Sequence, residues 1–185
     1  LNSKGEFLSA ADGENILALA ENDDFIFAEV DNLGDYTFDD CFNDKHIEEV
    51  LKLDLVDVDL VKSAGFKVVV DAVNSTGGFM VPNLLDKMGV ECVKLFCDPN
   101  GQFPHNPEPL PENLTEISKL VVSERADFGI VVDPDVDRLA IVCEDGTMFG
   151  EEYTLVTVAD FVLSKTPGNT VSNLSSTRAL SDITK

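Results

Sequence analysis

The chain has 185 residues, of which 44% are hydrophobic, so it fits one globular domain with or without an appended piece. Its formal net charge is −22, from 35 acidic and 13 basic residues. Because polyanions and anionic membranes attract basic surfaces, this excess of carboxylates argues against nucleic acid and membrane partners. An anionic substrate would need a local positive centre.

Cysteine usage and the absence of targeting signals indicate a reducing compartment. The four cysteines have no CxxC spacing, which predicts reduced thiols without a disulfide scaffold: Cys41, Cys92, Cys97 and Cys143. No signal peptide and no apolar run long enough to span a bilayer is visible, so we expect a cytoplasmic protein. The chain begins with Leu1 and not with Met, which is compatible with a fragment of a longer protein.

The first third of the chain shows short helical patterns separated by turns. Ser9 is placed to cap a helix through residues 15–20, and helical spacing recurs over residues 46–53 and 57–64. We therefore predict a linker with helices over residues 1–63, followed by a domain over residues 64–185.

From Phe66 onwards, β-branched runs alternate with helical patterns. The runs FKVVVDAV, VECVKLF and FGIVV predict buried strands, and RLAIVCEDGTMF predicts a hairpin. The turn NSTGG opens a helix that ends at Gly89, with Pro82 near its first turn. A helix capped by Asn113 or Thr115 is expected to run through Val122. Two more helices are expected at residues 151–165 and 177–183, and a last strand over residues 169–174.

This order of elements predicts an α/β fold. A strand–helix–strand–helix alternation is typical of a largely parallel sheet that is covered on both faces. We expect a three-layer α/β/α sandwich with a mostly parallel mixed sheet. In such sheets, ligands gather outside the carboxyl ends of the strands.

The segment IVVDPDVDRLAIV carries the clearest chemical signal. Asp133, Asp135 and Asp137 alternate on a loop between two apolar runs, and Arg138 follows directly. Three carboxylates packed this closely repel each other unless a cation joins them. Mg²⁺ prefers such oxygen ligands, and the planar guanidinium of arginine fits phosphate oxygens. The pattern therefore indicates metal-assisted phosphate chemistry.

Three other interpretations of this loop are possible. An EF-hand needs glycine where Arg138 stands, and a strand follows where its loop would continue, so we reject it. A haloacid-dehalogenase-type phosphatase would use Asp133 as nucleophile and Asp135 as acid–base; it expects Thr or Val where Asp137 stands and stays the alternative. A polar loop without a ligand fits poorly, because three alternating aspartates between apolar strands are unusual.

Other polar features are assigned structural roles. NSTGG is interpreted as a tight strand-to-helix turn more readily than as a phosphate site, since it lacks Walker and GxGxxG spacing. His46 and His105 have no evident sequence partner, so we expect packing or exposed-loop roles for both. Thr177 and Arg178 are interpreted as a helix cap with a surface arginine.

Four segments together resemble the α-D-phosphohexomutases, the phosphoglucomutase/phosphomannomutase group. They are VVVDAVNSTGG, FPHNPEPLPENL, ADFGIVVDPDVDRLAIVCEDG and VSNLSSTRALSDI, and the similarity covers about residues 66–185. The resemblance implies an enzyme that interconverts hexose 1-phosphate and 6-phosphate through a phosphoserine and a bisphosphate sugar. It implies that Asp133, Asp135 and Asp137 bind Mg²⁺ and that Arg138 stabilises the phosphoryl group.

Some parts of the family's sequence pattern have no counterpart in this chain. The serine loop of the family is absent: His105-Asn106-Pro107 echoes its end, but Phe103 and Pro104 stand directly before it, so no nucleophilic serine is placed there. The sugar-selecting loop and the C-terminal phosphate-binding domain are absent too, which leaves glucose, mannose and glucosamine phosphates open. The resemblance therefore implies an isolated second domain, with residues 1–63 leading out of the first domain. We expect it to be inactive alone and to work with the other domains of the same polypeptide on a phosphohexose.

Overall fold

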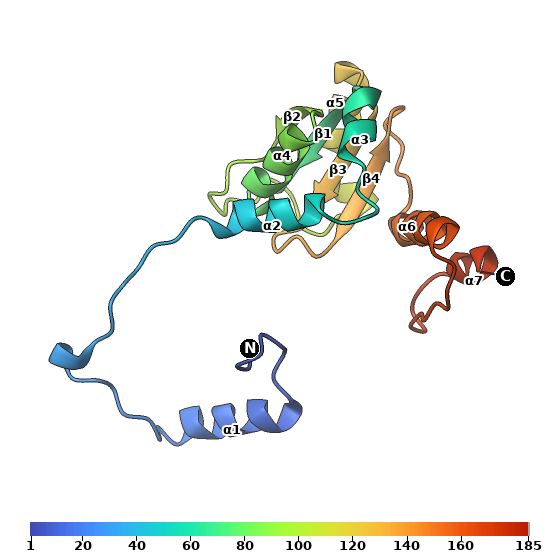
Figure 1. Cartoon of the computed structure of the whole chain (residues 1–185). Helices are drawn as coiled ribbons and strands as arrows, with labels where there is room; N and C mark the ends of the chain where they lie inside the picture. The colour runs from blue at the N-terminus through green and yellow to red at the C-terminus, as the bar shows by residue number, and fades with distance from the viewer. Residues whose placement is uncertain (185) are drawn as a thin grey trace. The chain divides into compact units, whose positions relative to one another are not determined.

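The computed structural model describes residues 1–184, in two compact units, Leu1–Asp40 and Cys41–Lys185 (Figure 1). The first unit holds helix α1 (Ala10–Glu21) and the short 3₁₀ helix η1 (Val30–Asn32). Ser9 caps α1 as predicted: its hydroxyl accepts the Asp12 N–H, and the Asp12 carboxylate accepts the Ser9 N–H. No residue of this unit is buried, so it contributes nothing to the core.

The second unit contains most of the alternating elements that the sequence predicts. In chain order they are α2 (Phe42–Leu51), α3 (Val58–Ala64), β1 (Lys67–Asp71), α4 (Gly77–Lys87), β2 (Glu91–Leu95), η2 (Pro111–Asn113), α5 (Thr115–Glu124), β3 (Phe128–Val132), β4 (Leu139–Cys143), α6 (Glu151–Lys165) and α7 (Ala179–Ile183). No helix within residues 1–184 has the length and apolar character needed to cross a membrane.

The four strands form one mixed sheet in the order β2-β1-β3-β4. β1 pairs in parallel with both β2 and β3, and β4 pairs antiparallel with β3. The carboxyl ends of β1 and β3 therefore lie side by side, since Asp71 is opposite Val131 in the register. The loop that follows β3 thus begins beside the end of β1, where the rule for parallel sheets places a site.

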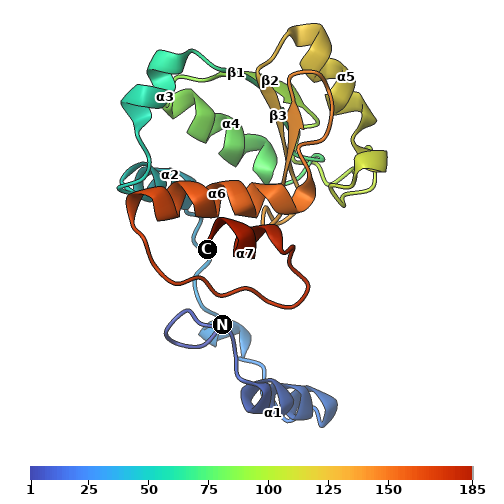
Figure 2. The same cartoon turned by 90° about the vertical axis from the view of Figure 1, so that its right-hand side faces the viewer.

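Helices cover both faces of this sheet, which confirms the three-layer α/β/α sandwich (Figure 2). Val69 of β1 points to one face and packs with Ile117 and Val121 of α5. Its neighbours Val68 and Val70 point to the other face and pack with α4. This alternation follows from the two-residue period of a strand, which turns successive side chains to opposite faces.

The predicted last strand, over residues 169–174, is wrong. This segment has no strand partner and runs as coil, with Val171 and Leu174 almost fully exposed. The run has the composition of a strand, but an extended segment needs a neighbouring strand to satisfy its backbone groups. All four strands in the described residues lie in the sheet of residues 67–143.

The start of α4 also differs from the prediction. The helix begins at Gly77, directly after the NST turn, so Pro82 is its sixth residue and lies beyond the first turn. A proline there removes the hydrogen bond to the carbonyl of Gly78. Gly78 itself packs against backbone: a Cβ atom on it would lie 2.5 Å from the Cys97 carbonyl oxygen. The first turn of α4 is therefore held close to the end of β2.

Replacing Gly78 with alanine is expected to lower the free energy of unfolding by about 1–3 kcal/mol, because the new methyl group overlaps a backbone carbonyl that cannot move aside. Chemical denaturation measures this. Gly13 is a matched helical control, since a Cβ there meets nothing within 4 Å. A Gly78→Ala chain that unfolds at the wild-type midpoint would show that α4 does not pack this closely.

Candidate metal site

The three aspartates lie on the connection between β3 and β4. Val132 pairs with Leu139 in the antiparallel ladder, so residues 133–138 form the closed end of a hairpin. Asp133 follows β3 directly and is 6% exposed, whereas Asp135 and Asp137 are exposed. One ligand oxygen from each carboxylate lies within 4.8 Å of the other two. The structure thus brings together the residues that the sequence singled out.

The charges of this cluster are not balanced by the protein alone. The carboxylate of Asp133 and the negative charge of Asp135 raise the pKa of Asp137 above its usual range, and Arg138 opposes them only in part. A cation among the three carboxylates removes this repulsion. Three hard oxygen donors, one of them buried, fit Mg²⁺ better than a soft metal.

Arg138 lies beside the cluster. Its backbone N–H donates to Asp133 Oδ1 at 3.0 Å, and its Nε atom is 3.9 Å from carboxylate oxygens of Asp133 and Asp137. Its guanidinium also pairs with the carboxylate of Glu108, from the proline-rich loop. The side chains of Arg138 and Glu108 are about half exposed. The guanidinium can therefore exchange this carboxylate for a phosphate group.

The NSTGG turn contacts the aspartate loop, and no local pattern in the sequence predicts this contact. The hydroxyls of Ser75 and Thr76 both donate to the carbonyl oxygen of Pro134, each at 2.8 Å. Pro134 lies between two of the aspartates. The turn is a strand-to-helix connection as predicted, and it also contacts the candidate site.

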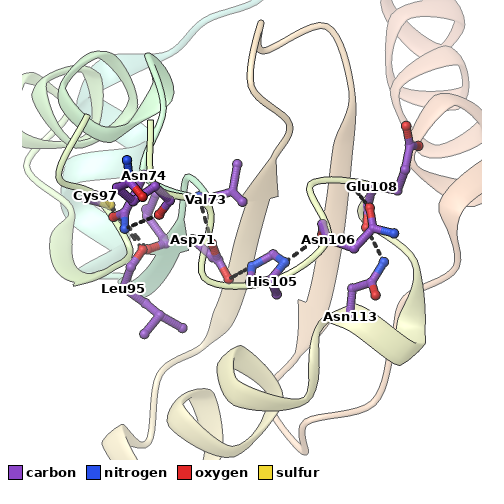
Figure 3. A network of polar contacts seen from close by, with 11 residues as sticks. Asp71, Val73, Asn74, Leu95, Cys97, His105, Asn106, Glu108 and Asn113 are labelled. Carbon is purple, nitrogen blue, oxygen red and sulfur yellow. Dashed lines mark hydrogen bonds and ion pairs between the residues drawn. The ribbon is translucent and has the colours of Figure 1, made fainter. Parts of the chain in front are cut away.

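His105 has a partner that sequence analysis missed. Its Nε2 atom lies 3.0 Å from Oδ2 of Asp71, which is 1% exposed at the end of β1 (Figure 3). Burial raises the pKa of the Asp71 carboxyl, while the Val73 N–H and the neighbouring imidazole oppose that rise. Nδ1 of His105 lies 2.7 Å from the Asn106 carbonyl oxygen. The imidazole thus joins the proline-rich loop to β1, so the expected exposed-loop or packing role is too weak a description.

The remaining sequence candidates lie outside the cluster. His46, on α2, lines a cavity of about 490 Å³ together with Thr76 and Asp135. Arg178 is exposed and is the N-cap of α7, without a side-chain capping bond, while Thr177 Oγ1 accepts the Ala179 N–H at 3.3 Å. The surface position of Arg178 agrees with the prediction.

Burial raises the pKa of two of the four cysteine thiols, Cys92 and Cys97. Burial raises the pKa of the Cys97 thiol to about 11, so this thiol stays protonated and unreactive at neutral pH. No disulfide joins the four cysteines within residues 1–184.

Comparisons with known proteins identify the family. The family described as "Phosphoglucomutase/phosphomannomutase, alpha/beta/alpha domain II" matches residues 44–146. A relative from Methanopyrus kandleri, named "Probable phosphoglucosamine mutase", is 33% identical over 157 residues, which are 84% of this chain and 34% of the relative. A phosphoglucomutase from Neisseria meningitidis is 32% identical over 179 residues, 95% of this chain and 37% of that protein.

A solved structure agrees with the sequence relatives. The phosphoglucomutase/phosphomannomutase family protein from Burkholderia thailandensis superimposes with a TM-score of 0.72 at 27% identity, over 95% of this chain and 38% of that one. The chain belongs to the phosphoglucomutase/phosphomannomutase family and contains its α/β/α domain II. This family differs from the haloacid-dehalogenase-type phosphatases, the alternative interpretation of the aspartate loop. The chain spans about a third of the length of the relatives it matches.

Proposed function

We propose that this chain is the metal-binding part of a phosphohexomutase that interconverts hexose 1-phosphate and 6-phosphate. The convergence of Asp133, Asp135 and Asp137 within 4.8 Å, at the carboxyl end of β3, is the observation that carries the proposal. Three acidic oxygens with unbalanced charge suit Mg²⁺. When bound, the ion supplies positive charge that stabilises a phosphoryl group in transfer.

The protein's own groups prepare the site. Asp133 is held by the Arg138 N–H and stays buried, so it fixes the inner wall of the cluster. Asp135 and Asp137 are exposed and face solvent, from which a sugar phosphate approaches. Arg138 is the residue we assign to phosphoryl stabilisation, because its guanidinium lies next to the carboxylates of Asp133 and Asp137 and is itself about half exposed.

The reaction as a whole needs groups beyond this chain. The phosphoserine and bisphosphate sugar intermediate implied by the family resemblance require a nucleophilic serine, and here Phe103 and Pro104 stand directly before His105-Asn106-Pro107 instead. We propose that residues 1–63 lead out of a preceding domain, that residues 64–185 are the metal-binding domain, and that the partners are a phosphohexose and other domains of one polypeptide. We also propose a cytoplasmic location, which the absence of disulfides among residues 1–184 supports.

The isolated chain is expected to show no mutase turnover with glucose 1-phosphate or mannose 1-phosphate in the presence of Mg²⁺. A coupled assay for the 6-phosphate product measures this, with a full-length relative as positive control. Full turnover by the chain alone would contradict the proposal that the phosphoryl donor lies in another domain.

Metal binding itself can be tested on this chain. We expect Mn²⁺, used as a spectroscopic probe for Mg²⁺, to bind with one-site stoichiometry by electron paramagnetic resonance titration. The triple variant Asp133→Asn, Asp135→Asn, Asp137→Asn should lose this site. A control with the same charge change at exposed positions, Glu48→Gln, Asp54→Asn and Asp86→Asn, should keep it. Equal binding by both variants would mean that the overall charge of −22, and not the triad, attracts the ion.

A further inference from the structure

The turn between β1 and α4 contributes two hydroxyl groups to the aspartate loop. We infer that Ser75 and Thr76 are positioning residues that hold this loop in its metal-binding conformation. The expected effect on metal affinity rests on the proposed function, whereas the expected effect on the conformation of the loop does not.

Both hydroxyls act on a single atom. Ser75 Oγ and Thr76 Oγ1 each donate to the carbonyl oxygen of Pro134 at 2.8 Å, which occupies both lone pairs of that acceptor. The residues that they join are 58 and 59 positions apart in the sequence. Because Pro134 stands between Asp133 and Asp135, its peptide plane decides where the second aspartate points.

The loop needs such a restraint because of its backbone. Val136 has a φ of +62°, a left-handed conformation that a β-branched residue rarely adopts. Its N–H donates to the Asp133 carbonyl at 3.2 Å, so the chain turns back on itself there. This turn returns Asp137 towards Asp133. A loop without outside support would relax at Val136 and separate the carboxylates.

The turn that carries the hydroxyls is itself fixed. The Ser75 N–H donates to the Ala72 carbonyl at 2.8 Å, and the Ser75 carbonyl accepts the Gly78 N–H at 2.9 Å. The Asn74 N–H donates to the Phe96 carbonyl at 2.6 Å. The two loops also touch closely, since a Cβ on Gly77 would lie 2.6 Å from Val132 Cγ2 and 3.4 Å from Val136 Cγ2. The hydroxyls thus connect a turn that is hydrogen-bonded to its neighbours with the loop that carries the left-handed Val136.

The experiment compares the wild-type chain with the double variant Ser75→Ala, Thr76→Val. In the metal-free protein, NMR amide exchange should become at least about tenfold faster at Val136 and Arg138, whose N–H groups donate within the loop. The Mn²⁺ dissociation constant should rise about tenfold.

The variant Ser75→Thr, Thr76→Ser keeps both hydroxyls and should behave like wild type. The control Ser63→Ala, Ser123→Ala removes hydroxyls that bond within α3 and α5 and should change neither readout.

A second background separates positioning from general stability. Glycine adopts the conformation of Val136 without strain, so the double variant should raise the Mn²⁺ dissociation constant by a smaller factor in a Val136→Gly chain. Unchanged amide exchange in the double variant overturns the inference, whatever the metal does. Faster exchange with unchanged Mn²⁺ affinity overturns its metal-binding step. Failure of the wild-type chain to bind Mn²⁺ contradicts the proposed function, and the exchange rates then still decide whether the hydroxyls position the loop.

Discussion

Replacing His105 with alanine is expected to lower the free energy of unfolding by about 2–4 kcal/mol at pH 7, measured by urea denaturation. The Asp71 carboxylate is buried, and the imidazole 3.0 Å away is its only side-chain partner in the described residues. Without it, an ionised carboxylate stays in the core, bonded only to the Val73 N–H. The matched control is His46→Ala, which removes an exposed imidazole and should change stability little.

The pH dependence of the His105 effect follows from the pKa of Asp71. Burial raises this pKa in the folded state above its ordinary value of 3.8, so folding favours the neutral acid. Stability from the neutral acid is fully present below pH 3.8 and is lost as the pH rises through the raised pKa. The deficit of the His105→Ala chain should therefore shrink towards pH 4. Adding Asp71→Asn should restore about half of the lost stability at pH 7; no recovery would show that the imidazole acts by packing alone.

Replacing Asp133 with asparagine is expected to weaken Mn²⁺ binding by at least about 10–100-fold, a range that loss of an outer-shell partner already reaches. Asp133 is 6% exposed and its Oδ1 accepts the Arg138 N–H, so its position is fixed before the ion arrives. Asp137 is exposed and must be ordered on binding. Asp137→Asn should therefore cost less, about tenfold.

Titration calorimetry with Mn²⁺ measures this order of effects. Each variant removes one negative charge, so long-range attraction of the ion falls equally in both. Asp145→Asn serves as the control, because Asp145 lies in the turn after β4 and its carboxylate accepts hydrogen bonds from the N–H and the hydroxyl of Thr147. A larger effect at Asp137 than at Asp133 would contradict the role of the buried carboxylate.

The sequence predicted the parts of the fold that local pattern controls. FGIVV became β3 and the RLAIVC run became β4, because β-branched and apolar runs suit the buried strands of a covered sheet. The helix over residues 151–165 has the predicted bounds. The aspartate cluster could also be predicted from the sequence, because its three carboxylates lie within five residues on one loop.

Contacts between distant segments were not readable from one sequence. His105 meets Asp71 across 34 positions, and Glu108 meets Arg138 across 30. Neither pair has a sequence spacing that predicts the contact, because the conformation of the proline-rich loop determines which residues come together. The predicted strand over residues 169–174 failed for a related reason. Its composition favours a strand, but pairing depends on a neighbour that local pattern does not supply.

The proposed metal site can be tested most directly by anomalous diffraction from crystals of this chain soaked in Mn²⁺. We expect one strong anomalous peak within coordination distance of carboxylate oxygens from Asp133, Asp135 and Asp137, and its loss in the triple asparagine variant. Crystals in which the three side chains point apart, with the manganese peak elsewhere on the acidic surface, would contradict it.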